Sequence, residues 1–237
     1  MSAPHAGAEP GQLQIHGRFE GGFGWIARPG EFMERSSTAF ADGGRVWLID
    51  PLRAGGLDAE LKALGTVAGV VVSYVGHERD ADWFATYYGV PVYVPRHLPL
   101  RPLGLKSRVE QIEARVPESP LQLVPSNGRR LLGWFRDTAI WWPQQGALAI
   151  GDTLGRAPYY LLPGERLAVH PLRRPQPPTE LLTLLPQRIY VGHGTSVTGG
   201  ATEALAEAVR TSRGKMWSAW RHALVTNWRT LRGQGQR

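Results

Sequence analysis

The fold is decided by residues 70–82, which read Val-Val-Val-Ser-Tyr-Val-Gly-His-Glu-Arg-Asp-Ala-Asp. An apolar run that ends abruptly in charged and imidazole side chains indicates a buried core strand with a cleft at its carboxyl edge. The polar residues of this stretch, His77, Arg79 and Asp80, are therefore the first candidate site residues.

Three other segments have the same form, a short apolar strand that ends in a polar residue. They are residues 45–51, 146–153 and 188–194, and they carry Asp50, Asp152 and His193 at their ends. His193 stands between two glycines, which let the backbone approach closely, so we expect it in a cleft. Asp152 is a second cleft candidate, although without a metal it could cap a turn or a helix start. We interpret Asp50, which precedes a proline, as a strand-end turn residue rather than a ligand.

In this order and at this spacing, the four segments resemble the metallo-β-lactamase superfamily over roughly residues 35–200. That family places its final metal-binding histidine in a Val-Gly-His-Gly segment, which stands here at residues 191–194. The resemblance implies an α/β (α+β) fold, a four-layer αββα sandwich of two mixed β-sheets flanked by helices. It also implies an ancestral chemistry in which two metals activate a water that attacks an ester, thioester, lactam or phosphodiester.

The resemblance further indicates that most metal ligands are missing. The family's loop normally reads His-x-His-x-Asp-His; at the corresponding residues 75–80, only the second histidine is kept, as His77. The family's next histidine should lie near residues 133–136, but the chain has no histidine between His97 and His170. One of the two implied sites thus keeps a single ligand. That site should not hold a metal, since catalytic zinc needs about three.

The other implied site keeps Asp152 and His193 and gains Asp80 where the family has a histidine. With His77 this makes four candidate ligands for at most one Zn, Mn or Fe ion. Arg79, however, takes the place of a ligand aspartate, and a guanidinium does not give up its proton. At roughly 6 Å and an effective dielectric near 20, it would repel a divalent ion by on the order of 5 kcal/mol. It could equally form a forked pair with Asp152 or Asp80 and supply the metal's charge itself.

Several of these residues have ordinary structural alternatives. His77 fits a cleft or a surface position equally well, and Asp80 could be the N-cap of the helix that follows. His170 lies on a loop where a solvent-exposed histidine is favoured over a replacement ligand. The aromatic residues Tyr74, Trp141 and Trp142 need a separate interpretation. For the adjacent tryptophans we expect packing on opposite faces of one strand, with an aromatic wall for a ligand as the alternative.

The secondary-structure pattern alternates strand hairpins with short helices. Helical spacing or turn signals indicate helices at residues 57–64, 80–88, 178–185 and 201–209. Strands are expected at residues 12–26, 38–50 with a turn at 42–44, 67–75, 90–94, 111–116, 121–124, 131–134, 138–142, 147–150 and near 189. A proline-rich loop over residues 156–178 should border the cleft.

Composition places these segments in one large domain. The 237 residues are 42% hydrophobic, which is enough for a full core. We expect a flexible N-terminus at 1–12, the main domain at 13–209 and a basic, Trp-rich helical extension at 210–237. With no secretory signal core and no apolar run of membrane-spanning length, a cytoplasmic location is expected. The absence of cysteine excludes disulfides and thiolate ligands.

The charge of the chain is concentrated at its C-terminal end. The formal net charge is +7, and residues 208–237 contain seven basic and no acidic side chains. After Gly214 a helical pattern places apolar residues on one stripe, namely Trp217, Trp220, Leu224, Trp228 and Leu231. We expect this stripe to dock on the domain. Contact with nucleic acid or with an anionic membrane is the sharper alternative, and a partner chain or a second copy is also open.

These observations predict a hydrolase-like protein with a degraded metal site and weak or no hydrolysis of an ester, thioester or phosphodiester. If activity persists, we expect hydrolysis with at most one metal, held by Asp152, His193 and either His77 or Asp80. Without a metal, His77 or Asp80 could serve as general base, but the sequence offers no nucleophile or oxyanion donor to complete such a scheme. The candidate catalytic residues are therefore His77, Asp80 and Arg79. The alternative is a non-catalytic binding protein, a pseudoenzyme, that uses the Arg79-neutralised cleft for a small anionic ligand or a partner. A further alternative makes the domain a carrier for the basic tail.

Overall fold

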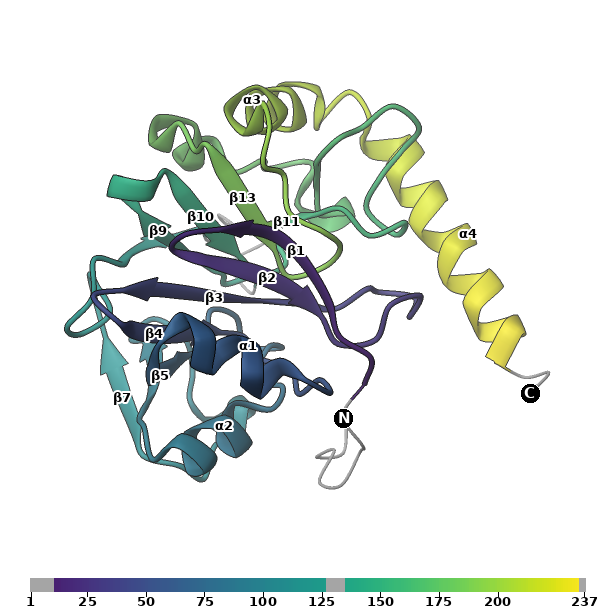
Figure 1. Cartoon of the computed structure of the whole chain (residues 1–237). Coiled ribbons are helices and arrows are strands. Elements are labelled where there is room, and N and C mark those ends of the chain that lie inside the picture. Colours follow the sequence, from purple (N-terminus) through teal and green to yellow (C-terminus); the bar gives the residue numbers. More distant parts are fainter. Residues whose placement is uncertain (1–10, 127–134, 235–237) are drawn as a thin grey trace.

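The structure, a computed structural model, describes residues 11–126 and 135–234, and of residues 102 and 227–234 the backbone alone. Two β-sheets lie face to face, with helices covering their outer faces (Figure 1). No helix in the described part of the chain is long and apolar enough to cross a membrane.

The first sheet has seven strands in sequence order. They are β1 (Gln14–Phe19), β2 (Gly22–Ile26), β3 (Ser36–Asp42), β4 (Arg45–Ile49), β5 (Thr66–Val71), β6 (Val92–Pro95) and β7 (Val109–Ile112). The strands from β1 to β4 pair antiparallel, and those from β4 to β7 pair parallel. Parallel neighbours need a crossover, which α1 (Leu57–Leu64) and α2 (Ala81–Tyr88) supply between β4, β5 and β6.

The second sheet has the strand order β13-β10-β9-β8. Its strands are β8 (Gln122–Pro125), β9 (Thr138–Trp142), β10 (Ala147–Ile150) and β13 (Arg188–Val191). A small ribbon of β11 (Leu154–Gly155) and β12 (Ala168–Val169) lies beside it, followed by α3 (Ala201–Thr211) and α4 (Met216–Gln234). The short 3-10 helices are η1 (Arg101–Leu103), η3 (Pro143–Gln145), η4 (Pro171–Arg173) and η5 (Thr179–Leu184).

Buried apolar side chains form three interfaces between four layers. Leu61 and Phe84 pack α1 and α2 on the first sheet, and Leu205 packs α3 on the second. Between the sheets, Trp142 lies edge-on to the ring of Phe40. Its neighbour Trp141 lies on the other face, in the cluster under α3. The predicted αββα sandwich is therefore confirmed, and the two adjacent tryptophans are core residues on opposite faces of β9.

Most predicted elements are present, with shifted ends. The strand β5 ends at Val71 instead of 75; two residues later, the backbone N–H of Ser73 bonds to the Asp50 carboxylate instead of a neighbouring strand. The helix predicted at residues 178–185 is the 3-10 helix η5, Thr179–Leu184. The predicted strand at 131–134 lies outside the described residues. The next strand along the chain, β9, pairs with β8 and β10.

His16 on β1 is held between two serines that link the sheets. Its Nε2 lies 2.9 Å from Ser36 Oγ, while its Nδ1 accepts a bond from the backbone N–H of Ser196 at 3.1 Å. Burial, with a smaller contribution from Arg156, lowers the pKa of His16 to about 4. The folded protein therefore keeps this imidazole neutral under conditions in which an unfolded chain would protonate it.

Acidification should therefore destabilise the fold through His16. Between pH 6.5 and about 4 the unfolded chain binds a proton that the folded chain does not, so stability falls as pH falls. From pH 7.5 to 5, the wild type should lose about 1 to 2 kcal/mol more than His16→Gln in urea unfolding. Equal losses in the two proteins would show that His16 titrates alike in both states.

Candidate metal centre

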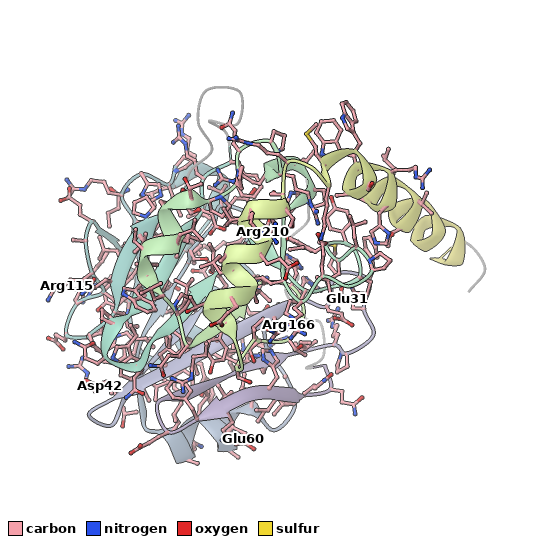
Figure 2. All side chains as sticks on the ribbon, turned by 90° about the horizontal axis from the view of Figure 1, so that it is seen from above. Glu31, Asp42, Glu60, Arg115, Arg166 and Arg210 are labelled. Carbon is pink, nitrogen blue, oxygen red and sulfur yellow. The ribbon has the colours of Figure 1, made fainter. Side chains whose placement is uncertain are left out.

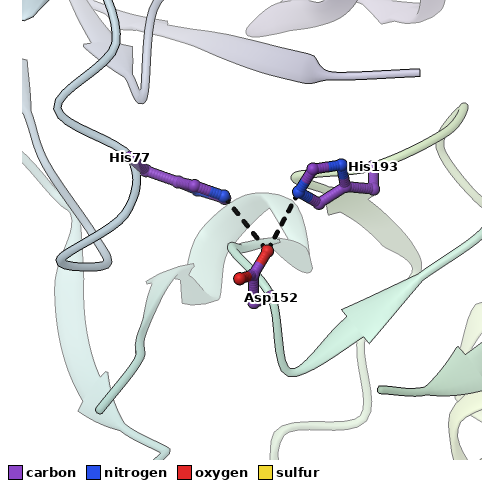
Figure 3. Close-up of side chains that lie close together, drawn as sticks. All are labelled: His77, Asp152 and His193. Atoms are coloured by element: carbon purple, nitrogen blue, oxygen red, sulfur yellow. Dashed lines mark hydrogen bonds and ion pairs between the residues drawn. The ribbon is translucent and has the colours of Figure 1, made fainter. Parts of the chain in front are cut away.

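Three strand ends bring His77, Asp152 and His193 together. Asp152 follows β10 and His193 follows β13; these strands are parallel, so their carboxyl ends meet at one edge. His77 comes from the loop after β5 in the opposite sheet. Figure 3 shows the three side chains converging across the space between these loops.

Both imidazoles approach the same carboxylate oxygen. Asp152 Oδ1 lies 3.1 Å from His77 Nε2 and 3.0 Å from His193 Nε2. One ligand-type atom from each residue lies within 4.8 Å of the other two. The histidines are buried, whereas the Asp152 side chain is 19% exposed, so the group opens to solvent on the Asp152 side.

The other ring nitrogen of each histidine is already committed. His77 Nδ1 lies 2.8 Å from Asp50 Oδ2, and His193 Nδ1 donates to the carbonyl oxygen of Met33 at 2.9 Å. A neutral imidazole with its proton on Nδ1 presents a lone pair at Nε2. If both nitrogens present lone pairs, each repels the carboxylate oxygen of Asp152. A proton or a metal ion between the nitrogens and the oxygen removes this repulsion. Carboxylate and carbonyl partners on Nδ1 are typical of metal-binding histidines, so the donor set fits one divalent ion.

Without a metal, a proton on His77 supplies the positive charge that a metal ion would bring to the group. Burial and Arg79 oppose its protonation, but the carboxylates of Asp152 and Asp50 outweigh them and raise the pKa of His77 to about 9. Burial also acts against an ionised Asp152, yet the two histidines hold the pKa of Asp152 well below its usual value. For His193, burial dominates over the bond to Asp152 and lowers the pKa.

Asp50 positions the ring of His77. It follows β4 with a left-handed φ of 49°, and its carboxylate accepts bonds from Ser73 N at 2.7 Å and Ser73 Oγ at 2.5 Å as well as facing His77. The interpretation as a turn residue is incomplete, because a turn is judged from sequence neighbours. The partners of Asp50 are 23 and 27 residues away and are brought close by the parallel pairing of β4 with β5.

Arg79 lies against the group without an ion pair to it. Its guanidinium donates to the carbonyl oxygens of Ser36, Asp50 (3.0 Å) and Gly192 (2.9 Å), and its Nη2 lies 3.2 Å from His77 Nε2. The predicted fork with Asp152 or Asp80 is absent among the described ion pairs, because carbonyls at three strand ends take the donors instead. Arg79 itself has a left-handed φ of 40°, which is uncommon for a residue with a side chain.

Asp80 lies outside the group, contrary to its prediction as a ligand. Its carboxylate accepts a bond from the backbone N–H of Arg53 at 2.7 Å, which turns it toward the loop after β4. Asp80 occupies the N-cap position of α2, as the alternative expected, but its side chain makes no capping bond to the helix.

Aromatic side chains flank the histidines. The ring of Tyr160 stacks on His193 with 5.8 Å between centroids, and its hydroxyl donates to the backbone oxygen of Asp152 at 3.2 Å. The ring of Tyr74 stands edge-on to His77 at 5.4 Å. The sequence contains no signal for Tyr160, since its contact depends on the fold of the proline-rich loop.

His170 belongs to the same aromatic surround. Its ring packs against Tyr160 and Phe135, and burial lowers its pKa to about 4. Its Nδ1 accepts a bond from the backbone N–H of Leu172 at 3.2 Å, and it is not part of the three-residue group. The expectation of a solvent-exposed loop histidine is therefore wrong, because the loop folds back over the centre.

The sandwich and the position of its strand-end residues define the metallo-β-lactamase fold. Solved structures with this fold include the metallo-β-lactamases DIM-1 (13% identity, TM-score 0.62, covering 86% of this chain and 100% of that one) and TMB-1 (15%, 0.62, 87% and 99%). FIM-1 from Pseudomonas aeruginosa, in its mono-zinc form, is also similar (13%, 0.55, 87% and 98%). No protein-family model and no curated protein matches the sequence. At these identities the likeness establishes the fold of this chain and not its activity.

Proposed function

We propose that this chain is a hydrolase-like protein that holds at most one divalent metal ion, weakly, through His77, Asp152 and His193. The observation that supports the proposal is the convergence of two Nε2 atoms on one carboxylate oxygen, with both Nδ1 atoms committed elsewhere. Three protein ligands with one open position are the usual set of a catalytic zinc site.

The residues of the centre would divide the work of hydrolysis. A metal ion held there would lower the pKa of a bound water and polarise the carbonyl or phosphoryl oxygen of an ester, thioester or phosphodiester. Asp50 and the Met33 carbonyl keep the two imidazoles in the ligand tautomer. Tyr74 and Tyr160 cover the flanks of the histidines, so water and substrate would enter beside the partly exposed Asp152.

Arg79 accounts for the weak binding in this proposal. A Zn–N distance is about 2.1 Å, so an ion on His77 Nε2 would lie no farther than roughly 5 Å from Arg79 Nη2. At an effective dielectric near 20, the repulsion is on the order of 6 kcal/mol before relaxation. Metal binding would also require His77 to lose the proton that its raised pKa favours in the metal-free protein.

A second candidate function is non-catalytic binding of a small anionic ligand. The observation that favours it is the fixed position of Arg79, whose guanidinium is held by three backbone carbonyls and keeps a permanent positive charge beside His77. In that case the metal-free protein is the working form.

Metal uptake by the purified, metal-stripped chain distinguishes the two. At a free Zn²⁺, Mn²⁺ or Fe²⁺ concentration about 100 times Kd, binding stabilises by about 2.7 kcal/mol and should raise Tm by about 5 to 10 °C. Elemental analysis should find one ion per chain. Asp152→Ala should lose both effects. Asp80→Ala is the matched control and should keep them, since Asp80 faces Arg53. A metal-free wild type with an unchanged Tm would favour the anion-binding protein.

A further inference from the structure

The C-terminal helix α4 is fixed to the domain by one side of its first half. Trp220 Nε1 donates to the carbonyl oxygen of Pro171, and His222 Nε2 to that of Pro158, both at 2.7 Å. Ala219 and Ala223, one helical turn apart, are buried. Small side chains at this spacing let the helix lie close against the 156–178 loop.

The predicted apolar stripe does not dock as a unit. Trp220 packs on the loop, but Trp217 and Leu224 are 70% and 71% exposed, because the alanines occupy the contact face. The side chains of Trp228 and Leu231 lie outside the described part of the chain. Thus one face of α4 docks on the domain, and a second face exposes apolar side chains to water.

This outward face is both apolar and basic. Trp217, Arg221, Leu224 and Val225 follow one another at intervals of four, three and one residues, which places them on the same side of a helix. All four are exposed. The helix extends beyond the layers of the domain, seen from the side in Figure 1 and from above in Figure 2, so this side is open to a large partner.

The charge of this C-terminal segment has a single sign. Residues 208–237 contain seven basic and no acidic side chains, while the first 207 residues contain twenty of each. A second copy of the chain would bring two uniformly basic helices together, which is repulsive. Nucleic acid would satisfy the arginines through its phosphates but would leave Leu224 and Val225 without an apolar environment.

We propose that the outward face of α4 lies on the surface of an anionic lipid membrane, parallel to the bilayer plane. Such an interface accepts both kinds of side chain: the indole and aliphatic groups enter the boundary of headgroups and acyl chains, and the arginines meet the lipid phosphates. The contacts of Trp220 and His222 hold the helix beside the loop that also carries Tyr160 and His170.

Vesicle flotation of the full chain tests the proposal. The chain should bind vesicles containing about one third phosphatidylglycerol at least tenfold more strongly than vesicles of phosphatidylcholine alone. High salt should weaken this preference, because it screens the arginines. Arg221→Gln, which removes the arginine of this face, should reduce the preference for the anionic vesicles.

The apolar contribution is tested by a matched pair of double variants. Trp217→Ala with Leu224→Ala should weaken binding by about tenfold or more. Trp83→Ala with Leu185→Ala removes the same two side-chain types from exposed positions elsewhere, 41% and 65% exposed, and should leave binding unchanged. Circular dichroism checks that each variant is folded. Zinc content reports separately on the candidate metal centre, because α4 contributes none of its three ligands.

Three results would overturn the proposal. One is equal binding to both kinds of vesicle, or an equal loss in both double variants. Another is binding to DNA without binding to vesicles, which would assign the face to nucleic acid. The third is self-association that Trp217→Ala with Leu224→Ala abolishes, again without vesicle binding, which would assign the face to a second copy.

Discussion

Arg79→Gln is expected to raise the affinity of the centre for Zn²⁺ by about 100- to 1,000-fold, or about 3 to 4 kcal/mol. The substitution removes the cation whose Nη2 lies 3.2 Å from His77 Nε2 and with it the repulsion of a bound divalent ion. The gain is smaller than the unrelaxed repulsion, because solvent and side chains already screen part of the charge. Competition with a chromophoric chelator measures the Kd directly.

Arg79→Lys is the control for charge. It keeps a cation on the same loop, so its Kd should stay within about tenfold of the wild type. Both substitutions remove the guanidinium and its bonds to the carbonyls of Ser36, Asp50 and Gly192. Each should therefore lower the free energy of unfolding of the metal-free protein by about 2 kcal/mol. An Arg79→Gln protein that is folded and binds zinc no better than the wild type would contradict the role given to Arg79.

Asp50→Asn is expected to cost about 3 to 5 kcal/mol of unfolding free energy. The buried carboxylate accepts from Ser73 N and Ser73 Oγ and faces His77 Nδ1. An amide of the same shape has one oxygen and one NH₂ group, so in either orientation a donor must face a donor. Urea unfolding at pH 7.5 measures the loss. Zinc affinity should fall as well, by about 10- to 100-fold, because the ring of His77 loses its orienting partner.

The matched control is Asp58→Asn on α1. Asp58 pairs with Lys62 at the surface, where such an ion pair contributes little, and its loss should change stability by less than about 1 kcal/mol. If Asp50→Asn were as mild as Asp58→Asn, Asp50 would be a turn residue only, as its position before a proline suggests.

Local sequence patterns predict the strand ends, and the resemblance to the metallo-β-lactamase superfamily implies the layers and three candidate ligands. The apolar runs that become β4, β5, β10 and β13 each end in a polar residue, and parallel pairing brings such ends to one edge. The strand-end pattern predicts that His77, Asp152 and His193 lie in a cleft, and the resemblance implies that they are candidate metal ligands. Trp141 and Trp142 could be assigned to opposite faces because the period of a strand is two.

Side-chain directions at the centre could not be chosen in this way. Asp80 follows Arg79 directly, yet its carboxylate turns to Arg53 while the guanidinium turns inward to carbonyls from three strands. This divergence depends on the left-handed backbone of Arg79, which no propensity of arginine indicates.

By itself, then, the sequence determined the order of strands and helices, the residues at the strand ends and the basic charge of the tail, because these are periodic or compositional properties of consecutive residues. Only the tertiary structure decided that Asp50 and the Met33 carbonyl orient the two histidines and that Asp80 faces away. It also decided that Ala219 and Ala223, and not the Trp stripe, form the docked face of α4. The physical reason is the same in each case: the partner is distant in sequence, and the direction of a side chain depends on which carbonyls, carboxylates and small residues the folded chain brings within a few ångströms of it.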